Sequence, residues 1–121
     1  MGKIFSHIDL RVPDLAAVDA FYRALLPALG FTVEEDIEGW LQFRSEDGSE
    51  FFGITGSPGH LANKNRIAFW GESRAHIDRI AELIIKHGAK NIEGPGPYAD
   101  LYYALFFEDP AGTRLEVTFE D

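Results

Sequence analysis

The chain contains no cysteine and has few basic residues. The absence of cysteine excludes disulfide bonds, thiolate nucleophiles and cysteine-based zinc sites. Lysine and arginine together number 11 against 20 acidic residues, which gives a formal net charge of −9. This balance argues against a nucleic-acid partner, which requires a basic surface to release counterions from phosphates. It argues equally against attraction to an anionic membrane surface.

Long apolar runs are also absent, because the N-terminal segment MGKIFSHIDL passes directly into patterned sequence. We therefore expect no signal peptide and no membrane span, with the cytoplasm as the default location. The chain does contain 45% apolar and 13% aromatic residues, enough for a hydrophobic core. Its 121 residues correspond to one ordinary domain, or to two very small modules that share a core.

The N-terminal segment Lys3–Val12 alternates apolar and polar residues, as a half-buried strand does. The alternation predicts that His7, Asp9 and Arg11 lie on one face of this strand. The apolar residues between them would lie on the opposite face, toward a helix.

A helix is predicted after this strand, because apolar residues recur at helical spacing between Asp14, an N-cap, and Gly30, a C-cap. Pro27 is expected to kink this helix or to end it early. Turns rich in Glu, Asp and Gly then separate three predicted strands, at Phe31–Glu35, Trp40–Arg44 and Glu50–Thr55.

After a linker at residues 57–65 the same order of elements begins again. A strand, a helix that stops at Gly88 and three further strands follow, and the two halves superimpose at an offset of 59 residues, with His7 on Arg66. The glycine-rich segment 93–98 is predicted to be a mobile loop. The sequence therefore predicts an α+β fold of two tandem βαβββ modules, about 1–56 and 66–121. Together they would form a curved eight-stranded mixed sheet around a cleft, with the helices on the outer face.

Three segments also stand in the order and spacing of a known family. They are SHIDLRVPDL with the following AFYRALLPALGF, then RIAF, and finally FFEDPAGTRLEVTF. Together they resemble the vicinal-oxygen-chelate superfamily, which includes glyoxalases, bleomycin-resistance proteins and extradiol dioxygenases, over essentially the whole chain. The resemblance implies a small-molecule ligand or substrate, a homodimer and, in metal-using members, a divalent ion such as Zn, Ni, Mn or Fe in the cleft.

The resemblance assigns the first metal-ligand position to His7 and the last to Glu116, and both residues carry suitable donors. Arg66 occupies the position at which many members have a histidine, and the remaining position falls at Phe52 or Gly53. Two donors make a poor metal site, and a guanidinium places a permanent positive charge where the cation would lie. We therefore expect Arg66 to pair with Glu116 without a metal, the alternative being a linker histidine that supplies a third ligand.

His7, Glu116 and Arg66 are the candidate catalytic residues. His7 would act as a general base or as a hydrogen-bond partner of the substrate. Glu116 stands between two apolar residues, which places its side chain on the open face of the sheet. Arg66 would pair with Glu116 or anchor an anionic or carbonyl-bearing ligand.

Three further residues are candidate substrate contacts. Arg11 and Trp70 share the strand faces of His7 and Arg66, respectively. Tyr103 is expected on the face of Glu116 if the last hairpin has no bulge, whereas a bulge would place Tyr102 there. Trp40 is expected to fill the core or a dimer interface.

Three function classes remain open at this point. The first is a metal-dependent lyase, isomerase or dioxygenase of the family type. The second is a protein of the bleomycin-resistance kind, which sequesters a ligand without metal or turnover. The third is a metal-free enzyme that uses acid–base chemistry on a small carbonyl or carboxylate compound.

Overall fold

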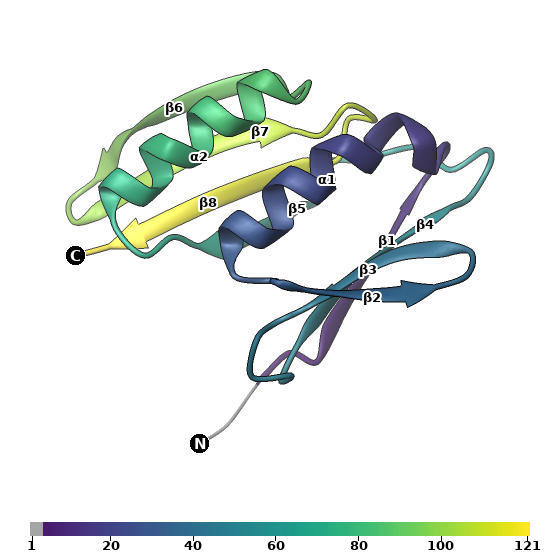
Figure 1. Cartoon of the computed structure of the whole chain (residues 1–121). Helices are drawn as coiled ribbons and strands as arrows, with labels where there is room; N and C mark the ends of the chain where they lie inside the picture. The colour runs from purple at the N-terminus through teal and green to yellow at the C-terminus, as the bar shows by residue number, and fades with distance from the viewer. Residues whose placement is uncertain (1–3) are drawn as a thin grey trace. The chain divides into compact units, whose positions relative to one another are not determined.

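One strand, one helix and three strands occur in the same order twice in the computed structural model (Figure 1). The structure describes residues 4–121, so the start of the predicted first strand at Lys3 lies outside the described residues. The chain divides into two units between residues 61 and 62, called here the first and second modules. The predicted pair of βαβββ modules is confirmed, with the eight strands divided into two four-stranded mixed sheets.

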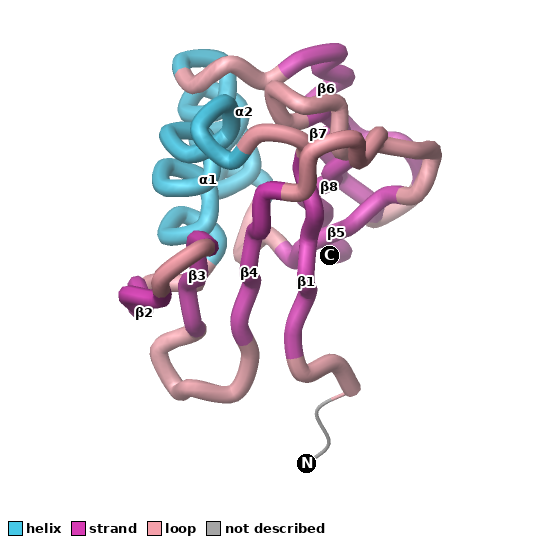
Figure 2. The backbone as a smooth tube through the Cα atoms, turned by 90° about the vertical axis from the view of Figure 1, so that its right-hand side faces the viewer, coloured by secondary structure: helices cyan, strands magenta, loops and turns pink. Residues whose placement is uncertain are grey.

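The sheet of the first module has the strand order β1-β4-β3-β2, and Figure 2 shows the four strands side by side in this order. β1 is parallel to β4, whereas β4, β3 and β2 are antiparallel to their neighbours. The helix α1 packs against β3 and β4. The elements are β1 His7–Val12, α1 Leu15–Leu29, β2 Val33–Ile37, β3 Trp40–Arg44 and β4 Phe51–Gly56.

The ends of α1 are set by the two predicted caps. The Asp14 carboxylate accepts a hydrogen bond from the Ala16 amide, and Gly30 adopts the left-handed conformation with φ 114°. Pro27 does not end the helix early, because it lies in the last turn and only two helical residues follow it. The Gly30 amide bonds back to the carbonyl oxygens of Leu26 and Pro27, which closes this end of the helix.

One face of the first sheet is buried against the apolar side of α1. The rings of Tyr22 on the helix and Phe52 on β4 stack with centroids 5.8 Å apart, and both side chains are fully buried. Aromatic pairs in this geometry add about 0.5–1.5 kcal/mol to the stabilisation from burial. The opposite face of the sheet is therefore the one left for a site.

The sheet of the second module has the equivalent order β5-β8-β7-β6, and α2 packs against β6, β7 and β8 (Figure 1). The predicted mobile loop at 93–98 is wrong, because these residues belong to a long strand, β6. Shifts in the β6–β7 register accommodate its glycines and prolines. The elements are β5 Arg66–Trp70, α2 Arg74–Lys86, β6 Lys90–Ala99, β7 Tyr102–Glu108 and β8 Arg114–Glu120.

Neither helix in residues 4–121 combines the length and the apolar character needed to cross a bilayer.

Gly71, which directly follows β5, is the tightest glycine position in the second module. A Cβ atom there would lie 2.6 Å from Cγ1 of Ile77 and 3.3 Å from Cγ1 of Val117, both fully buried. We expect Gly71→Ala to lower the free energy of unfolding by about 1–3 kcal/mol through overpacking, as measured by urea denaturation. Gly96→Ala is the matched control, because a Cβ atom at Gly96 would meet no atom within 4 Å. Equal stability of the two variants would contradict this packing.

Candidate functional site

The open face of the first sheet is organised in three rows of side chains set by the strand register. Residues that pair across neighbouring strands point to the same side of the sheet. The rows are His7, Phe51 and Arg44, then Asp9, Gly53, Gln42 and Glu35, and then Arg11, Thr55 and Trp40. The predicted common face of His7, Asp9 and Arg11 is therefore confirmed.

A pocket of about 300 Å³ opens on this face. Gly53 lies in the middle row and has no side chain, so the rows on either side of it rise as walls. The pocket thus occupies the space that a side chain at Gly53 would fill. Its lining residues are His7, Ile8, Asp9, Arg11, Trp40, Gln42, Phe51, Gly53 and Thr55.

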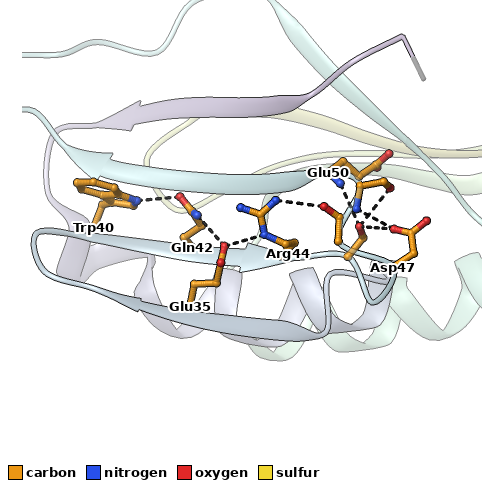
Figure 3. A network of polar contacts seen from close by, with 9 residues as sticks. Glu35, Trp40, Gln42, Arg44, Asp47 and Glu50 are labelled. Carbon is orange, nitrogen blue, oxygen red and sulfur yellow. Dashed lines mark hydrogen bonds and ion pairs between the residues drawn. The ribbon is translucent and has the colours of Figure 1, made fainter. Parts of the chain in front are cut away.

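A chain of hydrogen bonds links Trp40, Gln42, Glu35 and Arg44 on this face of the sheet (Figure 3). The Trp40 indole Nε1–H donates to Oε1 of Gln42 at 2.9 Å, and Nε2 of Gln42 donates to Oε1 of Glu35 at 2.7 Å. Arg44 donates to the same Glu35 oxygen at 3.1 Å. The hydrogen bonds from Gln42 and then Arg44 hold the pKa of Glu35 below its ordinary value. The network fixes the Gln42 amide and the Trp40 ring in place.

A side chain at Gly53 would press against this network. A Cβ atom at Gly53 would lie 3.3 Å from Oε1 of Gln42 and 3.7 Å from Cδ1 of Trp40. The carboxamide of Gln42, which pairs with Gly53 in the register, takes the space beside it.

The wall formed by the first row is rigid. The His7 and Phe51 rings stack with centroids 4.3 Å apart and planes 5° apart, and the Arg44 guanidinium lies over the Phe51 ring at 4.7 Å. Nδ1 of His7 shares a hydrogen bond of 2.8 Å with the Ser6 hydroxyl. Among residues 4–121, nothing bonds to the other ring nitrogen of His7, Nε2.

Arg11 also lines the pocket, as part of an exposed ion pair. Its Nη2 lies 3.2 Å from Oδ2 of Asp9, and the two side chains are about half exposed. Such a pair contributes little to stability, on the order of 0–1 kcal/mol, so a ligand can replace it at low cost.

Glu116 lies on the open face of the second sheet, where the alternation of β8 predicts it, and is 7% exposed. The Tyr102 hydroxyl donates a hydrogen bond to its carboxylate. This bond raises the pKa of the Tyr102 phenol, an effect that the Thr118 hydroxyl partly opposes.

The orientation predicted for Tyr103 is wrong. A five-residue connection joins β7 and β8 in an uninterrupted register, in which Tyr102 pairs with Glu120 and so shares the face of Glu116. The Tyr103 side chain points to the helix side, where its hydroxyl donates to Asp78 of α2 at 2.6 Å. Tyr102 therefore lies on the open face without the bulge that the alternative prediction invoked.

Arg66 does not pair with Glu116 in the described part of the chain, residues 4–121, contrary to the prediction. Its guanidinium lies over the Phe106 ring, 4.8 Å from the centroid. The Glu116 carboxylate instead accepts a hydrogen bond from the Tyr102 hydroxyl. A neutral hydroxyl has a smaller desolvation penalty on burial than a guanidinium. Trp70, on the same strand face as Arg66, is 67% exposed.

The strand register also decides the family's remaining ligand position. β4 and β8 are equivalent strands, and aligning them through their partners β1 and β5 places Gly53 on Glu116. In the first module the two positions are therefore His7 and Gly53, and in the second they are Arg66 and Glu116. Each module thus offers a single donor, and residues 4–121 contain no cluster of three metal-binding side chains. The residues present do not fit a divalent metal.

Sequence reasoning missed two residues that form the pocket. Trp40 was expected in the core or at a dimer interface. Its 40% exposure excludes the core, and it lines the pocket. Gln42 was not singled out, although a polar residue between apolar ones at the centre of a strand was a signal for it. The pocket roles of Trp40 and Gln42 could not be predicted without the strand register, which places both side chains beside Gly53.

Removal of the Tyr102 hydroxyl leaves the buried Glu116 carboxylate without this donor. We expect Tyr102→Phe to lower the free energy of unfolding at pH 7 by about 1–3 kcal/mol, as measured by urea denaturation. Because the folded state raises the pKa of Tyr102, its stabilisation is present below the ordinary value of 10.0 and is lost as the pH rises above it. Tyr103→Phe removes an exposed bond and is expected to cost less than about 1 kcal/mol. An equal cost for both variants would contradict the role of Tyr102.

Comparisons with known proteins agree with this fold. The family model described as the Glyoxalase/Bleomycin resistance protein/Dioxygenase superfamily matches residues 4–117. None of the curated proteins matches the chain.

Solved structures match over nearly the whole chain. A glyoxalase/bleomycin resistance protein from Albidiferax ferrireducens T118 is 27% identical with a TM-score of 0.82, and the match covers 97% of this chain and 98% of that one. The fosfomycin resistance protein FosX from Listeria monocytogenes, complexed with Mn(II) and sulfate, is 21% identical with a TM-score of 0.72. That match covers 100% of this chain and 93% of that one, and at this identity it shows the fold alone. The chain belongs to the Glyoxalase/Bleomycin resistance protein/Dioxygenase superfamily.

Proposed function

We propose that the chain binds a small molecule with an aromatic ring in the pocket over Gly53, without a metal ion. The observation that carries this proposal is a pocket of about 300 Å³ with one aromatic wall held in place from below. This volume is at the lower end of the range for ligand sites, roughly 300–1,000 Å³, and suits a molecule of one or two rings.

Trp40 is the main reason to expect an aromatic ligand. A large apolar ring that is 40% exposed, yet fixed by a hydrogen bond to Gln42, presents its surface without losing conformational freedom on binding. On the first row, His7 and Arg44 both pack against Phe51, and neither side chain covers Trp40 in this structure. A flat ligand that lies against the indole suits this geometry.

The polar groups of the pocket suit a neutral or singly charged ligand. Asp9 and Arg11 balance each other, and the Thr55 hydroxyl lies in the same row as Arg11. A carboxylate on the ligand would bind Arg11 in place of Asp9. Nε2 of His7 adds a further hydrogen-bonding group at the other end of the pocket.

The metal-free part of the proposal rests on the residues at the four ligand positions. Gly53 offers no donor, and Arg66 adds a permanent positive charge. Mn(II) belongs to the FosX structure, whereas residues 4–121 of this chain contain no cluster of three metal-binding side chains.

A probe that carries one ring and one carboxylate tests the pocket directly. We expect 4-nitrobenzoate to bind the protein in calorimetric titrations, and cyclohexanecarboxylate, which has no aromatic ring, to bind more weakly. Trp40→Leu should weaken 4-nitrobenzoate binding roughly tenfold through lost stacking and burial. Trp70→Leu, which removes an exposed tryptophan of the second module, should leave the affinity unchanged.

Either of two results would contradict this proposal. One is equal affinity for 4-nitrobenzoate and cyclohexanecarboxylate, and the other is an equal change in affinity in Trp40→Leu and Trp70→Leu. Recovery of the probe unchanged would assign binding alone, as in a sequestering protein. A modified product would assign catalysis, with His7 as the first residue to substitute.

Metal content tests the second part of the proposal. After incubation with Zn, Ni, Mn or Fe and desalting, we expect well under one equivalent of metal per chain by elemental analysis. Arg66→His restores a third donor and should increase metal retention. One equivalent of metal per chain in the unmodified protein, lost in both His7→Ala and Glu116→Ala, would show that a metal site exists. That result would contradict the metal-free proposal.

A further inference from the structure

We infer that Arg66 and Arg114 form a binding site for an oxyanion group, a phosphate or a carboxylate, on the open face of the second sheet. Arg66 begins β5 and Arg114 begins β8, and the two residues pair in the register of these parallel strands. Their side chains leave the same face of neighbouring strands, which lie about 4.8 Å apart. The inference rests on residues of the second module alone and does not depend on the function proposed for the first.

Neither guanidinium has an ion pair or a hydrogen bond among residues 4–121. Two like charges directly opposite each other in a sheet destabilise it. Glu108 lies opposite Arg114 in the register, but no acidic side chain among residues 4–121 forms an ion pair with either arginine. An anion bound between the two arginines would remove the repulsion.

The position of Arg66 leaves its binding edge open. The guanidinium lies over the Phe106 ring, so its flat face is used for packing, 4.8 Å from the ring centroid. The N–H groups lie in the plane of the guanidinium, and this edge forms the paired hydrogen bonds to oxyanions. The contact with Phe106 therefore orients Arg66 without occupying its donors.

Four carboxylates share this face, those of Glu93, Glu108, Glu116 and Glu120. The two next to Arg114, those of Glu108 and Glu116, are engaged elsewhere. Glu108, which pairs with Arg114 in the register, accepts a hydrogen bond from Nδ2 of Asn91 at 2.9 Å. Glu116, two residues after Arg114, accepts the hydroxyl of Tyr102. Both carboxylates reduce the attraction for an anion, so we expect a weak site for a free ion.

Aromatic rings beside the arginines indicate what the oxyanion is attached to. Tyr98 meets Phe106 edge to face, with centroids 5.1 Å apart, and Tyr98 is 47% exposed. A ring carried by the ligand would pack against them. We therefore expect phenyl phosphate to bind more tightly than inorganic phosphate.

Arginine side-chain NMR resonances report on this site directly. The Nε–Hε signals of Arg66 and Arg114, assigned from the Arg66→Gln and Arg114→Gln proteins, should shift saturably with inorganic phosphate at constant ionic strength. Either substitution should weaken the binding seen at the other arginine roughly tenfold. Arg79→Gln is the matched control, because it removes the same charge from an exposed position on α2 and should leave the affinity unchanged.

Three results would overturn the inference: no shift at either arginine with phosphate, phenyl phosphate or acetate, an equal shift at Arg79, or unchanged affinity in both glutamine variants. Tighter binding of phenyl phosphate would assign the site to a phosphorylated aromatic compound, and equal binding would assign it to free phosphate. A shift with acetate alone would assign it to a carboxylate ligand. Tighter binding of phenyl phosphate, equal binding of the two phosphates and a shift with acetate alone each support an oxyanion site.

Discussion

The strand register within each sheet is the constraint on which the candidate sites depend. It places Gln42 opposite Gly53 in the first module and Phe106 opposite Glu116 in the second. Because side chains alternate strictly along a strand, a slip of one residue would send each set to the helix side. The buried face holds the register in place, since Phe52 is fully buried in the core.

The two modules use the same backbone positions in opposite ways. In the first, the residue with no side chain leaves a hollow, and the amide of its partner fills only part of the space. In the second, the carboxylate of Glu116 is buried and the hydroxyl of Tyr102 satisfies it. A duplicated fold has thus produced one pocket with an aromatic wall and one aromatic face on which Arg66 and Arg114 have no ion pair among residues 4–121.

The order of the elements and the face of each strand could be predicted from the sequence. Period-two alternation sufficed to group His7 with Asp9, and the caps sufficed to locate α1. Pro27 does not end α1 early, because it lies in the last turn and two helical residues still follow it. The segment 93–98 was taken for a loop because glycine and proline are rare in strands, yet irregular pairing with β7 accommodates them.

The partners of the charged groups could not be predicted. Opposite charges at Arg66 and Glu116 suggested an ion pair, but the register gave Glu116 a tyrosine and Arg66 an aromatic ring. Which of Tyr102 and Tyr103 reaches Glu116 depends on whether the last hairpin contains a bulge of one residue, and the sequence does not determine this. The exposure of Trp40 likewise depends on Gly53, thirteen residues away in a different strand.

The central claim is that the pocket over Gly53 binds a small aromatic molecule without a metal. A crystal structure with 4-bromobenzoate tests it most directly, because anomalous scattering locates the bromine independently of the model of the ring. We expect one bromine peak in this pocket, with the ring against the Trp40 indole and the carboxylate near Arg11. A bromine peak elsewhere, or a metal ion bound to His7, would contradict the account.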